Sequence, residues 1–213
     1  FLHFPTALEA YRPRMPETTL VEANWVEGGW STLPAQRWEL DGSEGGALPL
    51  QADVDVVALR AALVGAGWQE APSGDAVAMA RFLSPDATLA QLPPLPLTHV
   101  GRFAALTLVR PLGPDSRLVL RFWPTTNLAV DDAARHPIHL GAVTRETIRH
   151  PLRLVTLLHD EEYPPAEQLA AVGELAGIDA QPHSLGDRRV VLLTLPAPVA
   201  PMPRGESSGG TTP

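Results

Sequence analysis

The sequence predicts an α+β fold in which about three helices pack against a mostly antiparallel sheet. Three observations support this class. Of the 213 residues, 45% are hydrophobic, which is enough to form a buried core. Runs with helical spacing of apolar residues are followed by runs of period two. Helices and strands are partly segregated along the chain, which disfavours a doubly wound parallel sheet.

We expect a single domain with tails on both sides. Residues 1–29 would form an N-terminal juxtamembrane-like segment, residues 30–196 the domain, and residues 197–213 a disordered tail of small and polar residues. Proline accounts for 23 of the 213 residues, so we expect short elements throughout the domain.

In the first hundred residues the pattern predicts two strands, two helices and a short helical turn, in the order 37–42, 47–53, 55–66, 73–83 and 86–91. The two strands would form a hairpin around the glycine-rich residues 42–46. Asp53 or Asp55 would cap the first helix, and Gly67 would end it. The segment LPPLPL at 92–97 resembles a polyproline ligand, but we expect a turn inside the domain there.

The second half is predicted to hold most of the sheet. Strands are expected at 102–111, 116–124, 137–147 and 151–160, followed by a helix at 165–176 and a last strand at 188–196. Residues 125–136 are polar and are expected to form a surface loop between the two hairpins.

The strand 116–124 carries the first candidate binding site. Side chains alternate between the two faces of a strand, so Arg121 and Trp123 share a face, opposite to a row of leucines. We expect that face to be exposed, and with Arg145 it could bind an anionic lipid or a protein partner. The alternative is a solvated sheet face on which these arginines pair with acidic side chains.

Histidines and carboxylates provide the candidate catalytic residues, His139, His159 and Asp160. If the strands 137–147 and 151–160 form a hairpin, His139 could lie near His159 and create a two-histidine site for a metal-assisted hydrolase. Alternatively, the acidic residues after His159 only favour the start of the next helix. We assign no metal ligand and no cofactor from the sequence.

Composition excludes several classes of function. The net charge of −8 argues against nucleic acid as a partner. All 16 basic residues are arginine, which excludes Schiff-base lysines and a phosphate-loop lysine. The absence of cysteine excludes thiol nucleophiles, disulfides and thiolate metal sites. The sequence also contains no apolar run of about 20 residues that could span a membrane.

Four segments, taken in order, resemble the LssY C-terminal domain family: RLVLRFW at 117–123, PIHLGAVT at 137–144, TLLHD at 156–160 and the acidic stretch before the helix at 165–176. The segments DVVALRAALVGAGWQEA and FLSPDATLAQLPPLPLTHVGR add to this similarity, which covers roughly residues 30–180. The acidic run from His159 is shorter than in the family pattern, so the resemblance transfers no active-site residue.

The resemblance implies a function through a larger protein. Such domains follow DedA-type membrane domains or type 2 phosphatidic-acid phosphatase domains in bacterial inner-membrane proteins. The chain would then be an extramembrane accessory or regulatory domain on the cytoplasmic face, without catalysis of its own. Its partner would be the membrane portion of the same protein, with anionic lipid as a further ligand.

Overall fold

We describe the fold from a computed structural model, in which residues 18–84, 86–130, 135–151, 155–173 and 175–194 are described. The expectations for residues 1–17 and for the tail at 197–213 therefore lie outside the described residues.

The strands in chain order are β1 (Thr18–Val21), β2 (Gln36–Trp38), β3 (Glu44–Ala47), β4 (Leu50–Asp53), β5 (Gln69–Glu70), β6 (Thr98–His99), β7 (Arg102–Phe103), β8 (Leu106–Gly113), β9 (Ser116–Val130), β10 (Arg135–Arg149), β11 (Leu157–Glu162), β12 (Asp179–Leu185) and β13 (Arg188–Thr194). The α-helices are α2 (Glu22–Glu27), α3 (Val56–Gly65), α4 (Ala76–Ala80) and α5 (Pro165–Val172). Short 3-10 helices are η1 (Gly29–Thr32), η2 (Arg81–Leu83) and η3 (Leu89–Gln91).

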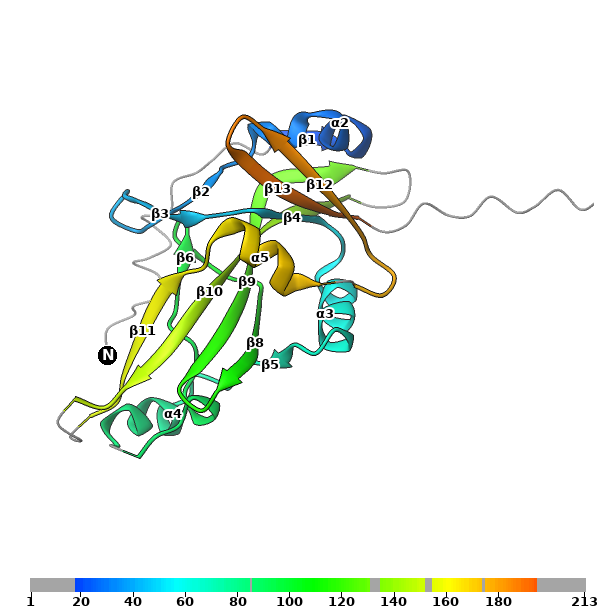
Figure 1. Ribbon diagram of the computed structural model, residues 1–213. Helices are drawn as coiled ribbons and strands as arrows, with labels where there is room; N and C mark the ends of the chain where they lie inside the picture. The colour runs from blue at the N-terminus through cyan, green and yellow to red at the C-terminus, as the bar shows by residue number, and fades with distance from the viewer. Residues whose placement is uncertain (1–17, 85, 131–134, 152–154, 174, 195–213) are drawn as a thin grey trace, which may run out of the picture.

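Most of the strands join one mixed sheet with the order β12-β13-β4-β10-β9-β8-β5 (Figure 1). β1 is added beside β9 and β11 beside β10. Among the described strand pairs of this sheet, only β1–β9 and β4–β13 are parallel, and the others are antiparallel. The predicted α+β class with a mostly antiparallel sheet is confirmed.

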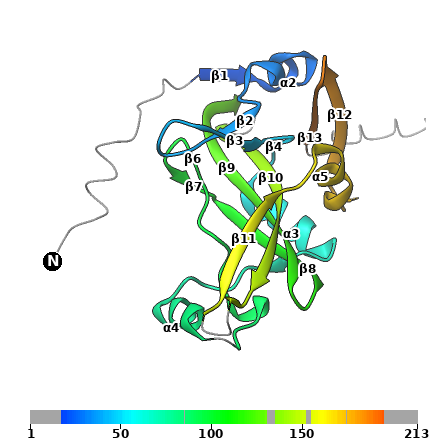
Figure 2. The same ribbon diagram turned by 60° about the vertical axis from the view of Figure 1, so that its left-hand side comes forward.

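Both faces of the central part of this sheet, around β4, β9 and β10, are buried. One core cluster lies under α3 and α5, and contains Leu118, Leu120 and Phe122 of β9. A second cluster lies on the opposite face, where Trp25 and Trp30 from the N-terminal part pack against Trp123. Figures 1 and 2 show α2 and α4 at opposite ends of the molecule. The sheet is therefore a middle layer, and both sides of β9 contribute to the core.

The prediction of a surface loop at 125–136 is wrong for the described part of that segment. β9 continues to Val130 and β10 starts at Arg135, and residues 128–130 pair with residues 135–137. The polar side chains made this segment look like a loop. Its backbone is nevertheless paired on both sides, because β1 adds to β9 at residues 127–130.

The expected hairpin of 37–42 and 47–53 is only partly correct. β2 pairs with β3, but the second half of the predicted partner leaves this hairpin as β4 and enters the main sheet. All four residues of β4 are buried, as expected for a strand covered on both faces. The sequence analysis also missed β12, an edge strand interrupted by Pro182.

The helix predictions agree better with the structure. Asp55 caps α3 by accepting hydrogen bonds from the backbone amides of Val57 and Ala58. Gly67, with φ of +91°, ends that helical segment. The predicted helix 165–176 stops earlier, because Gly173 with φ of +72° leaves the helical conformation.

A glutamine of α5 closes a gap in the sheet. β4 pairs with residues 139–141 of β10 and β11 pairs with residues 144–149, so the ladder on this edge of β10 is interrupted. The side chain of Gln168 fills the interruption: its Oε1 accepts from the amide of Val143 at 2.7 Å, and its Nε2 donates to the carbonyl of Tyr163. Gln168 is 3% exposed. The side chain thus replaces a missing strand residue.

We predict that Gln168→Leu lowers the free energy of unfolding by about 2 kcal/mol, because a buried backbone amide loses its partner. Urea denaturation followed by circular dichroism measures the change. Gln69→Leu, at an exposed position of β5, is the control and should change stability by less than about 0.5 kcal/mol. Equal stability of the two variants would contradict the role of Gln168.

Candidate functional site

The main cluster of charge is a buried ion triad of Arg117, Glu146 and Arg121 on adjacent strands β9 and β10. Arg117 donates from Nε and Nη2 to Oε2 of Glu146 at 2.9 and 2.7 Å. Arg121 donates from Nη2 to Oε1 at 2.8 Å. The exposed fractions are 3% for Arg117, 2% for Arg121 and 0% for Glu146. Both oxygens of the carboxylate are thus used, and the triad carries one excess positive charge.

The arginines of the triad, together with Arg37, hold residues 89–98, which we call the proline strap. The carbonyl oxygen of every third strap residue accepts a hydrogen bond from an arginine: those of Leu89, Leu92, Leu95 and Thr98. Arg117 supplies the first two at 2.7 and 2.8 Å, Arg121 the third at 2.8 Å, and Arg37 the fourth at 3.1 Å. A spacing of three suits both the 3-10 helix η3, which has three residues per turn, and the extended proline-rich residues that follow it. The segment LPPLPL is therefore an internal ligand of the sheet.

The expected exposed Arg/Trp face is wrong. The alternation along β9 was predicted correctly, but the strap covers that face, and Trp123 is 1% exposed with its Nε1 directed to the carbonyl of Leu97 at 3.3 Å. Arg121 is occupied by Glu146, the strap and Thr144. Arg145 lies apart from them; it is exposed and donates to Oγ of Ser116 at 3.0 Å. The three predicted ligand-binding residues do not form one surface.

The predicted two-histidine site is also wrong. The hairpin of β10 and β11 does form, but its register places His159 opposite Thr147, eight positions along β10 from His139. Eight strand residues span about 26 Å, far more than two ligands of one metal allow. His139 is 5% exposed, whereas the side chain of His159 is 54% exposed and lies 3.5 Å from Glu161.

Asp160 faces the opposite side of β11 from His159 and joins the triad instead. It pairs in register with Glu146. Burial raises the pKa of Asp160, and this effect exceeds the lowering by a hydrogen bond with Thr144 and by the charge of Arg121. Within the part of the chain that the structure describes, its Oδ1 is buried and has no hydrogen-bond partner. The shifted pKa thus has a structural cause.

We predict that Asp160→Asn raises the free energy of unfolding at pH 7, because it removes a carboxylate whose charged form is disfavoured by burial. A raised pKa means that the folded state binds the proton more tightly than the unfolded state, whose Asp pKa is near 3.8. Wild-type stability should therefore fall as the pH rises from about 4 through the raised pKa, and the variant should lack this fall. Urea titrations at pH 4 and pH 7 test it, with the exposed Asp86→Asn as control. A less stable Asn variant at pH 7 would contradict the prediction.

The sequence analysis missed several polar partners of this cluster, among them His99 and Arg37. His99 accepts a hydrogen bond on Nδ1 from the amide of Trp38 at 3.2 Å. Burial, followed by the charges of Arg37 and Arg102, lowers the pKa of His99 to about 4. No local motif marks these residues, because the strap and β2 bring them together from distant parts of the chain.

Arg110 of β8 has a structural role. Its guanidinium donates to the carbonyls of Ala66 and Ala171, at the C-terminal ends of α3 and α5, at 3.0 and 2.7 Å. It also lies 4.5 Å from the ring centroid of Trp68. A cation at two helix C-termini stabilises both, because their carbonyl groups carry partial negative charge.

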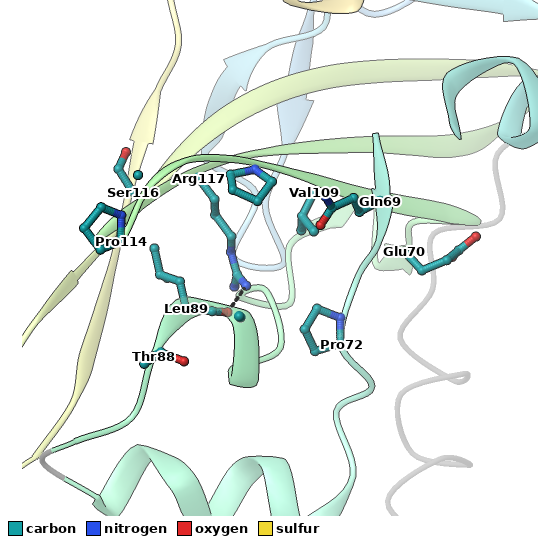
Figure 3. Close-up of a pocket in the computed structure, with 12 residues that line it drawn as sticks. Gln69, Glu70, Pro72, Thr88, Leu89, Val109, Pro114, Ser116 and Arg117 are labelled. Atoms are coloured by element: carbon teal, nitrogen blue, oxygen red, sulfur yellow. Dashed lines mark hydrogen bonds between the residues drawn. The ribbon is translucent and has the colours of Figure 1, made fainter. Parts of the chain in front are cut away.

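A pocket of about 300 Å³ lies next to the triad, between the start of the strap and the β8–β9 turn (Figure 3). Its walls include Pro72, Leu89, Val109, Pro111 and Pro114, and Arg117 lies at its inner side. Figure 3 shows Arg117 directed to the carbonyl of Leu89 at this wall.

Within the ranges that the structure describes, no three side chains of His, Cys, Asp or Glu converge to hold a metal ion. Among the described helices, none combines the length and the apolar character that crossing a bilayer requires.

Comparison with known proteins identifies a family. A family model described as LssY C-terminus matches residues 30–152, a shorter range than the resemblance seen in the sequence. No curated protein and no solved structure matches the chain.

Proposed function

Because the chain belongs to the LssY C-terminus family, we propose that it is an extramembrane accessory or regulatory domain of a bacterial inner-membrane protein linked to lipid-phosphate metabolism or envelope maintenance. Its main partner is the membrane portion of the same protein, nucleic acid is not a partner, and catalysis belongs to the membrane portion. The resemblance of the sequence to domains fused with DedA-type and phosphatidic-acid phosphatase domains supports this proposal.

One observation carries the proposal: the main cluster of charged side chains, the triad, is used to hold the fold and is closed to a substrate. Arg117, Arg121 and Glu146 bind one another and the strap, and they are almost fully buried. A reactive site needs groups that a substrate can reach, whereas these groups lie beneath the strap. A domain built in this way is better suited to binding or stabilising the membrane portion than to catalysing a reaction.

The first experiment tests the link to the membrane. The full reading frame that contains this chain is expressed and fractionated, and the product should remain in the membrane after carbonate washing. The region before Phe1 should encode apolar helices of about 20 residues. A product that is recovered without the membrane would overturn the proposal.

The same protein can test the cytoplasmic orientation. The chain has no cysteine, so a single cysteine at Val57, which is 68% exposed, becomes a specific label site in this domain, with any cysteine in the rest of the full protein replaced by serine. A membrane-impermeant maleimide should label it only after the inner membrane is opened. The protein without the added cysteine is the control, and labelling in intact spheroplasts would place the domain on the other side.

The last experiment tests for catalysis in this domain. In the full protein, His159→Ala and Asp160→Asn should each keep phosphatidate hydrolysis within about twofold of the wild type, because neither residue takes part in turnover. Circular dichroism confirms that the variants are folded. A tenfold loss in a folded variant would contradict the accessory role and favour an active site at β11.

A further inference from the structure

The described residues around the pocket beside the triad have no charge to offer to a ligand. Arg117 directs its donors to Glu146 and to two strap carbonyls. Glu70, at the rim, is paired with Arg60 at 2.6 Å, and Oγ of Ser116 accepts from Arg145. The remaining wall is mostly aliphatic. An ion entering the pocket would lose hydration without gaining a counter-charge, so an uncharged apolar group fits it best.

The walls of the pocket are held open by the backbone. Pro72 follows β5, whereas Pro111 and Pro114 belong to the β8–β9 hairpin, and the ring of each fixes its φ angle. Leu89 is tied to β9 through the bond of its carbonyl with Arg117. A pocket with such fixed walls is present before the ligand arrives, which lowers the entropy cost of binding.

We propose that this pocket binds the end of a lipid hydrocarbon chain. A volume of about 300 Å³ corresponds to roughly ten groups of the size of a water molecule or methylene, at about 30 Å³ each. This volume suits the end of a hydrocarbon chain of about eight carbons and is too small for a helix or strand of another protein. The choice of a lipid as the source of the chain rests on the proposed function, whereas the apolar character of the ligand rests on the pocket alone.

The head group of such a lipid stays outside the pocket. Because the described wall offers no unpaired charge, affinity depends on the length of the chain and hardly on its head group. 1-Octanol and octanoate should therefore bind with dissociation constants within about threefold of each other, and 1-butanol should bind at least tenfold more weakly. Inorganic phosphate should not bind here.

The test uses ¹H–¹⁵N NMR spectra of the 213-residue chain titrated with these four probes. Octanol should shift the amide signals of Leu89, Val109 and Gly113, which border the pocket. Absence of these shifts at saturating octanol, or equal shifts with inorganic phosphate, would overturn the proposal.

Two variants fill the pocket, each with a matched control. Gly113 and Ala90 both line the pocket, and a Cβ atom at Gly113 meets nothing within 4 Å, so Gly113→Val adds carbon to this lining and Ala90→Phe adds a ring. Gly65→Val and Ala80→Phe make the same changes at exposed helix positions elsewhere. The filling variants should weaken octanol binding at least tenfold and the controls less than twofold. If the filling variants and their controls weakened octanol binding equally, the hydrocarbon chain would bind outside this pocket, and the inference would be overturned.

The two proposals can fail separately. If octanol binds as expected but the full protein is not a membrane protein, the pocket remains and the lipid source is wrong. If the full protein is membrane-bound but octanol leaves the pocket signals unchanged, the accessory function remains and this inference is wrong.

Discussion

Glu146→Gln is expected to lower the free energy of unfolding by about 3 to 5 kcal/mol, because it leaves two buried arginines without their anion. Arg117 and Arg121 are 3% and 2% exposed and share this one carboxylate. The substitution keeps the size of the side chain but places an amide where guanidinium groups need an acceptor. The strap should loosen as well, because Leu95 donates its amide to Oε1 of Glu146 at 2.9 Å.

Urea denaturation and hydrogen exchange of the strap amides measure both effects. The control is Glu70→Gln, which breaks an exposed ion pair with Arg60. The side chains of Glu70 and Arg60 are 54% and 53% exposed. That change should cost less than about 1 kcal/mol. If the free energy of unfolding fell equally in the two variants, the buried triad would not contribute more to stability than an exposed ion pair. A Glu146→Gln variant recovered only as aggregates agrees with the prediction, provided that the control remains folded.

Gly141→Ala is the second change with a large expected effect, a loss of about 3 kcal/mol or more. Gly141 lies opposite Phe122 in the ladder of β9 and β10. A Cβ atom there would approach ring carbons Cδ1 and Cζ of Phe122 to 2.7 and 2.9 Å. The ring is 0% exposed and belongs to the core cluster under α3 and α5. Neither the backbone nor the ring can move without opening the core.

Thermal unfolding followed by circular dichroism measures the loss. Gly65→Ala is the matched control: a Cβ atom at Gly65, in α3, meets nothing within 4 Å. Alanine favours a helix more than glycine, so this control should gain up to about 1 kcal/mol. A Gly141→Ala variant as stable as the wild type would show that the ring packs elsewhere.

Local signals predicted α3 well, and the reason is physical. The cap at Asp55 and the stop at Gly67 act within one turn of the helix, so a short window of sequence contains the necessary information. Edge strands lack such signals. β12 contains Pro182 and mostly exposed residues, so its sequence resembles a loop although its backbone pairs with β13.

The candidate site was predicted less well, because it depends on the register of the strands and on which segments cover the faces of the sheet. Alternation along β9 indicated that Arg121 and Trp123 share a face, but not that the strap lies on it. The hairpin of β10 and β11 was expected, yet the separation of His139 and His159 follows from a register set by the connection between the strands.

The amino-acid sequence by itself determined the α+β class, the helix α3 with its cap, the alternation of β9 and the family resemblance, because these depend on neighbouring residues or on their order. Only the tertiary structure decided that the arginines of β9 are internal, that Gln168 completes the sheet and that a pocket remains beside Arg117. These features join residues that are 25 or more positions apart in the chain, and the free energy of burying a charge is known only when its partners are in place.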